Sequence, residues 1–343
     1  MGDADKLLPL NDAMRARLLL AASRHPLAVR VARGLSMSGV REHEPLLLLV
    51  SGGGDSLAML LLVAAVRERT DATLGSLAVL SVDHALRDES REECGVALSL
   101  ARTLAIERAE MVRVLVARAG NLLHAARIAR YDAALRHARA LGIEAIAVAH
   151  QADDVAEGLV LALERGGGLD SVEELLPSRA VADGPERIVR PFLRITRGEL
   201  RAFLTDLGVA WRDDPSNETH ARGALRTVPE TRALIERMAR GAGRLAEEAG
   251  TLAAWRDAEV RRLLPDGARE APRDTIDRAP LPVMRALLRR LVHAGGGDVS
   301  RSTLESAVEA ISSGDRSPRA FPCGNGVQLV VDARAVRVTA QDR

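Results

Sequence analysis

The fold of this chain is decided by the stretch LLLLVSGGGDSL at residues 46–57. It begins as an unbroken apolar run, passes through three glycines and continues as a leucine-rich run to Val63. This pattern predicts a strand, a loop and a helix. A strand that is apolar at every position is typical of a parallel sheet buried on both faces. Glycines that let the backbone approach a ligand, followed by a helix N-terminus, favour a phosphate-binding loop over a plain turn.

Two commoner phosphate loops do not fit this stretch. The Walker pattern requires a lysine after its second glycine, and Lys6 is the only lysine of the chain. The dinucleotide fingerprint requires a glycine at position 57, where the chain has a leucine. A carboxylate beside an anion site has a clear use as a magnesium ligand, which we assign to Asp55. We predict that a phosphate is bound by Ser51, Gly52, Gly53, Gly54, Asp55 and Ser56.

The composition limits the classes of function. The chain has 343 residues, enough for two domains with cores, and its net charge of +1 argues against a strongly basic binder. The two cysteines, Cys94 and Cys323, are far apart and form no Cys-x-x-Cys motif, which argues against zinc ribbons, iron–sulfur sites and a disulfide framework. No signal-peptide pattern and no segment long enough to span a bilayer is evident, so we expect a cytoplasmic location without membrane insertion.

Strands and helices are predicted to alternate after the glycines. Three further strands are expected at 77–82, 111–116 and 143–149. Helices are expected at 89–106, 121–141 and 151–163. The alternation predicts an α/β fold, a parallel sheet with helices on both faces. Polar clusters follow the strand ends, where such sheets bind ligands: 51–56, 83–87 and 150–157.

Other segments of the first part have weaker signals. Residues 11–36 predict one amphipathic helix that Pro26 interrupts. Residues 177–187 form a loose acidic stretch. Thr196 and Glu199 have the spacing of a capping box, and Gly208 is placed to end the helix that they begin.

The alternation stops near residue 218, where we expect a second domain. A helical core stripe follows at 235–252, although Gly241 and Gly243 weaken the prediction of one continuous helix. Two shorter helices are expected, one at 282–292 and one behind a capping box of Ser302 and Glu305. The tail predicts a small hairpin. We therefore expect a first domain at 1–217 and a smaller, mostly helical domain at 218–343.

Two pairs of side chains are candidates for chemistry. Asp154 and Glu157 are three residues apart, so they share a face of one helical turn. Acids at a helix start also serve as caps, but these two follow a strand end that faces the glycines, which favours a ligand. Arg127 and Arg130 share a helix face and suit a phosphate, with a solvated face as the alternative.

Two histidines follow strand ends near the expected ligand. His84 and His150 are either ligand contacts or structural imidazoles held by hydrogen bonds, and the sequence leaves both interpretations open.

Seven pieces of the chain form an ordered set of motifs: 51–56, 83–87, 126–131, 149–157, 165–168, 190–193 and 214–217 with Arg222 and Arg226. This set resembles the tRNA(Ile)-lysidine synthetase family of PP-loop ATP-pyrophosphatases. The resemblance covers about residues 45–230. The first motif is shared by all ATP-pyrophosphatases, whereas the ordered set is specific.

The resemblance implies a ligase with a Rossmann-like PP-loop catalytic domain at 1–217 and a tRNA-binding or accessory domain at 218–343. Such an enzyme uses ATP and Mg²⁺ to join free lysine to C2 of the wobble cytidine of the isoleucine tRNA with a CAU anticodon. An adenylated cytidine is the intermediate, and pyrophosphate and AMP are released. The oligomeric state is left open, with a dimer as one option.

The resemblance also implies residue roles. The catalytic set is Asp55, Asp154, Glu157, Arg127 and Arg130. The ATP site is the loop 51–56 with His84, and the lysine site is the pair Asp154 and Glu157. The tRNA contacts are Arg165, Arg190, Arg222 and Arg226.

The chain departs from the family pattern at several positions. Gly54 stands where proline is more usual, Leu123 where an acid is expected, and Gly158 where threonine is usual. The segment from Arg222 to Arg226 lacks an expected asparagine and a middle arginine. Glycine at position 54 only loosens the loop, and a catalytic or binding role at position 123 is lost or moved. The departures between Arg222 and Arg226 bear on tRNA recognition.

Three other functions were weighed. A tRNA-thiolating enzyme with the same loop usually has a cysteine pair or an iron–sulfur site, which this chain lacks. An amidotransferase synthetase subunit requires a glutaminase partner. A nucleotide-binding RNA-binding protein without catalysis is the third, and release of pyrophosphate from ATP distinguishes it from the ligase.

Overall fold

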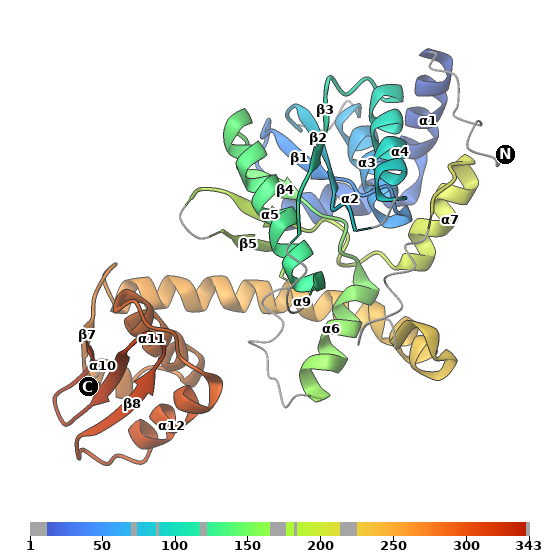
Figure 1. The fold of residues 1–343 in the computed structure, drawn as a ribbon. Coiled ribbons are helices and arrows are strands. Elements are labelled where there is room, and N and C mark those ends of the chain that lie inside the picture. Colours follow the sequence, from blue (N-terminus) through green and yellow to red (C-terminus); the bar gives the residue numbers. More distant parts are fainter. Residues whose placement is uncertain are drawn as a thin grey trace. The chain divides into compact units, whose positions relative to one another are not determined.

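A six-stranded sheet lies at the centre of the first part of the chain (Figure 1). This computed structural model describes residues 12–69, 74–86, 89–116, 122–164, 176–181, 184–212 and 225–340. The strands are β1 Leu46–Leu49, β2 Leu77–Asp83, β3 Arg108–Arg113, β4 Ala145–Ala147, β5 Ser178–Ala180 and β6 Arg187–Val189. Their order is β3-β2-β1-β4-β6-β5, and the pairing is parallel except between β5 and β6.

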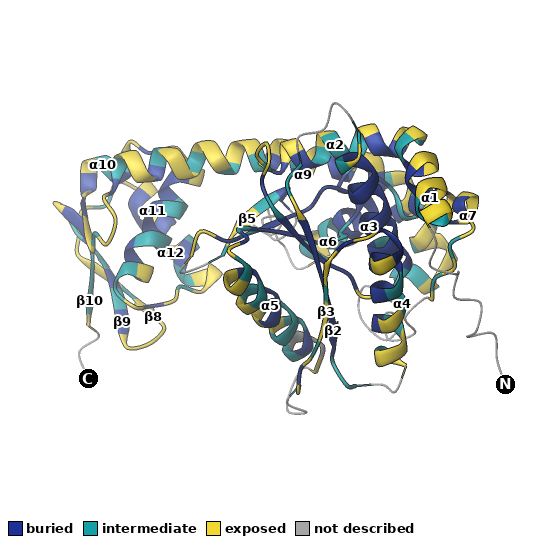
Figure 2. Cartoon of the chain, turned by 90° about the horizontal axis from the view of Figure 1, so that it is seen from above, coloured by how far each residue is buried: buried dark blue, intermediate teal, exposed yellow. Residues whose placement is uncertain are grey.

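Helices cover both faces of this sheet, as predicted. They are α1 Asp12–Arg24, α2 Pro26–Met37, α3 Gly54–Arg67, α4 Ser90–Thr103, α5 Leu122–Leu141 and α7 Arg197–Leu207. The remaining helix, α6 Ala152–Glu164, packs in a separate core. Leu46 and Leu48 of β1 pack in one core with α1–α4 and α7, whereas Leu47 and Leu49 pack in a second core with α5. All four leucines are buried, and so is most of α3 (Figure 2). The unbroken apolar run is therefore explained by cores on both sides of β1.

The strand order places two chain segments next to each other. The chain passes from β1 to β2 and β3 on one side and then crosses to β4 on the other side of β1. The carboxyl ends of β1 and β4 therefore lie at the point where the strand order reverses. Open α/β sheets bind ligands at this switch point. Residues 51–56 follow β1 and residues 150–157 follow β4, which is the convergence that the sequence predicts.

Two details of the first part differ from the predictions, and a third agrees with them. β3 begins and ends three residues earlier than expected, since its edge position leaves most of its side chains exposed and weakens the apolar signal. β5 and β6 lie in the stretch expected to be loose, because strands of three residues carry little pattern. The interruption expected at Pro26 is present: α1 ends at Arg24 and α2 begins at Pro26, with His25 as its cap, since His25 Nδ1 accepts a hydrogen bond from Leu27 N (3.2 Å).

The chain divides into two compact units at Gly250. The predicted boundary at 217/218 falls inside the first unit, because the first half of α9 (Pro229–Leu263) packs there. Ile235 and Ala246 of α9 share a core with Val155 of α6. The assignment of separate catalytic and accessory domains stays a prediction.

The second unit combines helices with a four-stranded antiparallel sheet, in the order β7-β10-β9-β8. Its elements after α9 are β7 Glu270–Pro272, α10 Arg273–Asp277, α11 Leu281–Ala294, α12 Arg301–Ser312, β8 Arg319–Cys323, β9 Val327–Val331 and β10 Ala335–Ala340. The predicted hairpin is β9 and β10, extended by a strand on each side. The expected capping box is wrong: Ser300 caps α12 by accepting from Thr303 N (3.1 Å), and Glu305 instead pairs with Arg285 (2.8 Å).

Membrane insertion has no candidate helix: among the described residues, none of the helices has both the length and the apolar character needed to cross a bilayer.

The two glycines inside α9 have different surroundings. A Cβ at Gly243 would lie 1.9 Å from the carbonyl oxygen of Leu193, whereas a Cβ at Gly241 would meet nothing within 4 Å. Gly243 therefore lets α9 pack directly on the backbone of residues 190–194, and the helix is continuous despite both glycines.

This difference gives a matched pair of substitutions. Gly241→Ala should raise the free energy of unfolding by about 0.5–1 kcal/mol, because alanine is the better helix former. Gly243→Ala should lower it by about 1–3 kcal/mol, because the added methyl group forces α9 away from Leu193. Chemical denaturation of the two variants measures both values. Equal effects at the two positions would contradict the close packing of α9 on this segment.

Candidate active site

Residues 51–56, here called the glycine loop, turn the chain from β1 into α3. Gly52 has φ +88°, and a Cβ on it would lie 2.2 Å from the carbonyl oxygen of Glu93, so only glycine fits there. Ser56 closes the loop, since its Oγ donates to Gly53 O (2.8 Å) and accepts from Ser51 N (3.2 Å).

The start of α3 is suited to an anion. The helix begins at Gly54, and no side chain in the described part of the chain caps its first turn. The first N–H groups are therefore available to a phosphate, which the helix dipole also favours. A Cβ at Gly54 would lie 3.0 Å from Trp211 Cδ1, so this departure from the family pattern coincides with a tryptophan packed against the loop.

Two acids, Asp154 and Glu157, lie in the first half of α6, the helix that follows β4. Asp154 is 8% exposed and Glu157 is fully buried. Asp154 Oδ2 accepts from Gln151 N (3.0 Å), so this side chain does serve as a cap. Its other oxygen, Oδ1, faces two arginines instead. The capping interpretation therefore holds for Asp154, and its role toward a ligand stays a prediction.

Arg197 joins the glycine loop to these acids. Its Nη2 lies 3.4 Å from Asp154 Oδ1 and 3.4 Å from Glu157 Oε1, and its Nε lies 3.8 Å from Asp55 Oδ2. The backbone N of Arg197 also donates to Asp153 Oδ2 (2.9 Å). Burial opposes the charge of Arg197, but the surrounding carboxylates outweigh it and raise the pKa of the guanidinium. Arg197 has no role among the predictions made from the sequence.

One signal could have identified Arg197. It occupies the first position of α7, where the helix dipole disfavours a positive charge. An arginine in that place requires acidic neighbours from elsewhere in the chain.

Arg226 lies on the same acids. It forms a bidentate pair with Glu157, through Nε to Oε1 and Nη2 to Oε2, both 2.7 Å, and its Nη2 also donates to Asp154 Oδ1 (3.1 Å). We predicted Arg226 as a tRNA contact. The structure directs its guanidinium to the acids, and 26% of its side chain is exposed.

The electrostatics of the site favour a cation. Burial, followed by the charge of Asp154, raises the pKa of Asp55 to about 6, although 29% of the Asp55 side chain is accessible. Burial also opposes the charge of Asp154, but Arg197 and other positive neighbours keep its pKa below the ordinary value. The carboxylates outnumber the arginines that contact them. The carboxylates are Asp55, Asp153, Asp154 and Glu157, and the arginines are Arg197 and Arg226.

His150, which lies at the start of the segment 150–157 after β4, is held neutral. Its Nδ1 accepts a hydrogen bond from Arg190 Nε (3.1 Å), and burial together with the Arg190 charge lowers the pKa of His150. The Nη1 of Arg190 donates to Leu176 O (2.8 Å), and Arg190 is only 1% exposed. The predicted direct tRNA contact of Arg190 is therefore corrected, because a side chain this buried positions His150 and has almost no surface to offer an RNA.

Arg127 and Arg130 lie on α5 near this histidine. Their guanidinium carbons lie 5.5 Å and 5.6 Å from the centre of the Tyr131 ring, within cation–π range. Both charges contribute to the lowered pKa of His150, which places them close to the site. Their predicted catalytic role stays a prediction.

The turn after β2 is shaped by an acid that sequence analysis did not assign. Asp83 is buried, and its Oδ1 accepts from Ala85 N (2.8 Å) and Ser90 Oγ (2.7 Å). These bonds hold Ala85 at φ +51° and place His84 at the strand end. The ATP contact predicted for His84 stays a prediction. Arg165, Arg222 and the side chain of Leu123 lie outside the described residues.

The fold has a clear counterpart among solved structures. A U34-tRNA thiolase from Methanococcus maripaludis, solved with its iron–sulfur cluster, matches 64% of this chain and 77% of its own chain. The TM-score is 0.51 at 17% sequence identity. At this identity the likeness shows the fold alone.

Sequence relatives identify the family. A PP-loop domain model matches residues 26–229. The tRNA(Ile)-lysidine synthase of Thermus thermophilus is 39% identical over 271 residues, which are 74% of this chain and 49% of that protein. The enzyme of the same name from Novosphingobium aromaticivorans is 36% identical over 258 residues, 73% of this chain and 76% of that protein. This chain spans about half the length of the Thermus protein. It belongs to the PP-loop family and, within it, to the tRNA(Ile)-lysidine synthase family.

Proposed function

We propose that this chain joins free lysine to C2 of the wobble cytidine in the isoleucine tRNA with a CAU anticodon, at the expense of ATP. The observation that carries the proposal is the contact of Arg197 with Asp55 of the glycine loop and with Asp154 and Glu157 of α6. This contact joins the glycine loop, which we propose binds phosphate, to the acids of α6, which we propose bind a cation, at one switch point. Membership of the PP-loop family supports ATP as a substrate.

The first step suits the glycine loop. The cytosine O2 attacks the α-phosphorus of ATP, and pyrophosphate leaves. The N–H groups at the start of α3 and the hydroxyl of Ser51 are proposed to hold the phosphates. The hydroxyl of Ser56 donates to Gly53 O here and would join them after releasing that carbonyl. Donors fixed in place before the reaction stabilise the charge that develops on the leaving group.

Magnesium is the cation that fits beside this loop. In the described part of the chain, no group of three or more His, Cys, Asp or Glu side chains could hold a metal ion alone. Asp55 is nevertheless close enough to Asp154 for the charge of one to raise the pKa of the other. Mg²⁺ typically binds one or two carboxylates and completes its shell with phosphate oxygens and water. We propose Asp55 as its protein ligand, and the ion would neutralise charge on the pyrophosphate.

The second step suits the acids of α6. The side-chain amine of lysine attacks C2 of the adenylated cytidine, and AMP leaves. Glu157 and Asp154 offer buried negative charge for the lysine ammonium and can accept its proton. His150 is a poor base because its pKa is lowered. Arg226 occupies both acids here, so on this proposal the lysine ammonium takes the place of its guanidinium.

The same proposal includes the tRNA contacts, a role for the second unit and the cellular location. Arg165, Arg222 and Arg226 are proposed tRNA contacts, and Arg127 and Arg130 are proposed to hold phosphate near His150. The second unit is proposed to assist tRNA binding, and the location is proposed to be cytoplasmic.

A direct assay tests the proposed function. The protein is incubated with labelled lysine, ATP, magnesium and a transcript of the CAU-anticodon isoleucine tRNA. Label should appear on the tRNA, and a transcript with cytidine 34 replaced by uridine should stay unlabelled. Absence of label with an active control enzyme would refute the proposal.

Asp55→Ala should abolish the release of pyrophosphate from ATP in the presence of tRNA, because the proposed magnesium ligand is lost. The midpoint of thermal unfolding should stay close to that of the wild type, since the side chain is partly exposed. Turnover like that of the wild type would remove Asp55 from the metal site.

Glu157→Gln should raise the KM for lysine by about 10- to 100-fold, because a buried carboxylate that faces an ammonium contributes about 1.5–3 kcal/mol. Pyrophosphate release should change much less, since lysine enters after it. Glu164→Gln on the same helix is the control, because Glu164 is exposed. A larger loss of pyrophosphate release than of lysine transfer would contradict the lysine site.

Arg197→Met should impair both steps by about 100-fold or more, the loss typical of misplaced reacting groups. Separate measurement of pyrophosphate release and lysine transfer checks this expectation. Arg197→Lys should restore part of both activities, since it keeps the charge but not the planar fork. If only stability fell and both steps kept their rates, Arg197 would be a structural residue alone.

A further inference from the structure

A second charged site lies away from the glycine loop, between α2 and α9. It is a recess of about 270 Å³ whose lining includes six arginines and one acid, Glu247. The arginines are Arg30, Arg33, Arg190, Arg194, Arg240 and Arg244. We call it the arginine recess. Neither the glycine loop nor the acids of α6 line it.

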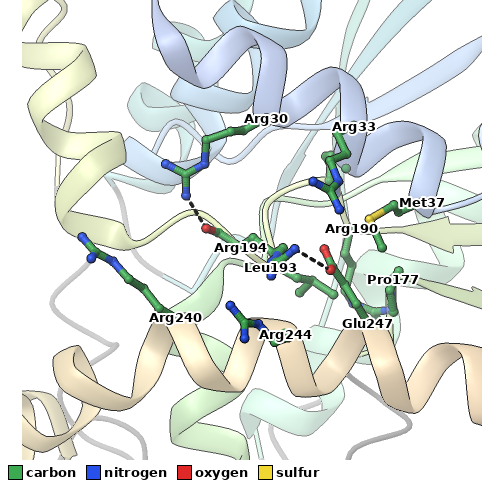
Figure 3. Close-up of a pocket in the computed structure, with 12 residues that line it drawn as sticks. Arg30, Arg33, Met37, Pro177, Arg190, Leu193, Arg194, Arg240, Arg244 and Glu247 are labelled. Atoms are coloured by element: carbon green, nitrogen blue, oxygen red, sulfur yellow. Dashed lines mark hydrogen bonds and ion pairs between the residues drawn. The ribbon is translucent and has the colours of Figure 1, made fainter.

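Two helices build opposite walls of the arginine recess. Arg30 and Arg33 come from α2, three residues apart, and Arg240 and Arg244 come from α9, four residues apart, so each pair shares a helix face. Figure 3 shows the guanidinium groups of both helices directed into the space between them. The backbone of residues 190–194 forms the floor, against which Gly34 of α2 and Gly243 of α9 pack closely.

The carboxylates near the recess neutralise only part of this charge. Arg30 pairs with Glu199 (2.6 Å) and Arg194 pairs with Glu247 (3.1 Å). In contrast, Arg33, Arg240 and Arg244 make no hydrogen bond or ion pair with any described residue, although the charges of Arg33 and Arg244 act on Glu247 and oppose the rise of its pKa that burial causes. Like charges that share a small recess repel each other, which has no benefit for the fold alone. An anion from outside the chain would remove this repulsion.

The lining indicates what kind of anion fits. It contains no aromatic side chain among the described residues, so a nucleobase has no ring on which to stack. The planar guanidinium of arginine matches the oxygens of a phosphate, and contacts to phosphates do not depend on the base sequence. Walls from two helices offer several forks at once, which suits the repeated phosphates of a nucleic-acid backbone.

We propose that the arginine recess between α2 and α9 binds the phosphate backbone of the tRNA substrate, independently of the tRNA sequence. The inference rests on the proposed function for the identity of the RNA. It adds Arg33, Arg240 and Arg244 as contacts outside the site where the wobble base reacts.

Binding of tRNA to the double variant Arg240→Glu/Arg244→Glu tests the inference. The dissociation constant should rise at least about 10-fold, and the slope of log K against log salt should fall by about 1–2, as for the loss of one or two phosphate contacts. The rise should be the same for the CAU tRNA and for a tRNA with another anticodon. At saturating tRNA, kcat should be unchanged while the KM for tRNA rises.

A matched control is Arg17→Glu/Arg24→Glu on α1, which changes the net charge equally at two exposed arginines outside the recess. Once the general effect of the lower net charge is subtracted, this control variant should bind tRNA within about twofold of the wild type. If the glutamate variant does not fold, Arg240→Gln/Arg244→Gln should show the same fall in the salt slope with a smaller loss of affinity.

Two results would overturn the inference. One is tRNA binding by the recess variant equal to that of the control variant. The other is unchanged tRNA binding with loss of inorganic phosphate binding, which would make the recess a site for a small anion. The labelling assay with the wild-type chain distinguishes a failure of this inference from a failure of the proposed function. If the wild-type chain labels the tRNA and the recess variant binds tRNA normally, only the inference about the arginine recess is refuted.

Discussion

The contacts of Arg197 hold the candidate active site together. One guanidinium reaches a carboxylate of the glycine loop and two carboxylates of α6, while its backbone N–H binds Asp153. Without it, acids from two strand ends would face each other unscreened in a largely buried site, which is costly. The position of Arg197 is fixed in turn by α7, whose start is held by the capping box of Thr196 and Glu199 and whose apolar face is part of the core on β1. The spacing of the site therefore depends on the packing of a helix that contributes no predicted ligand.

The segment 190–194 connects this site to the rest of the first unit. Arg190 holds His150 neutral, Phe192 is fully buried and forms a bridge with Gln151, and Arg194 pairs with Glu247 of α9. Two glycines on different helices allow this close packing. The Arg-Pro-Phe-Leu motif was connected with tRNA from the sequence, but in the structure it positions His150 and Gln151 next to the candidate active site. It also separates the site from the arginine recess, so that a change on one side of this segment can be felt on the other.

The sequence predicted the parts whose signals are local. The glycine loop, the strand before it and the helix after it, the capping box of α7 and the αL cap at Gly208 each follow from a few neighbouring residues. The convergence of residues 51–56 and 150–157 also followed, because parallel sheets bring their strand ends to one edge. Arg197 and the position of Arg226 were missed because their partners lie far away in the chain. The division at Gly250 was missed for a similar reason: the helical period of α9 is uniform, and only tertiary packing decides which core each half joins.

The pairing of Arg226 with the acids bears on how a cationic substrate would bind. Four carboxylates in one place are stable only while positive charge is near. Arg197 and Arg226 supply it here, and the charge of Arg201 also acts on Asp55. On the proposed mechanism, an incoming lysine ammonium exchanges with one guanidinium, so the charge of the site stays balanced through binding. Binding of lysine then costs the loss of the bidentate Arg226–Glu157 pair, and it does not require the burial of an additional charge. Because Arg226 is itself among the proposed tRNA contacts, transfer of its guanidinium from the acids to an RNA phosphate would free the acids when the wobble base arrives. Such coupling would make lysine binding depend on the presence of the RNA.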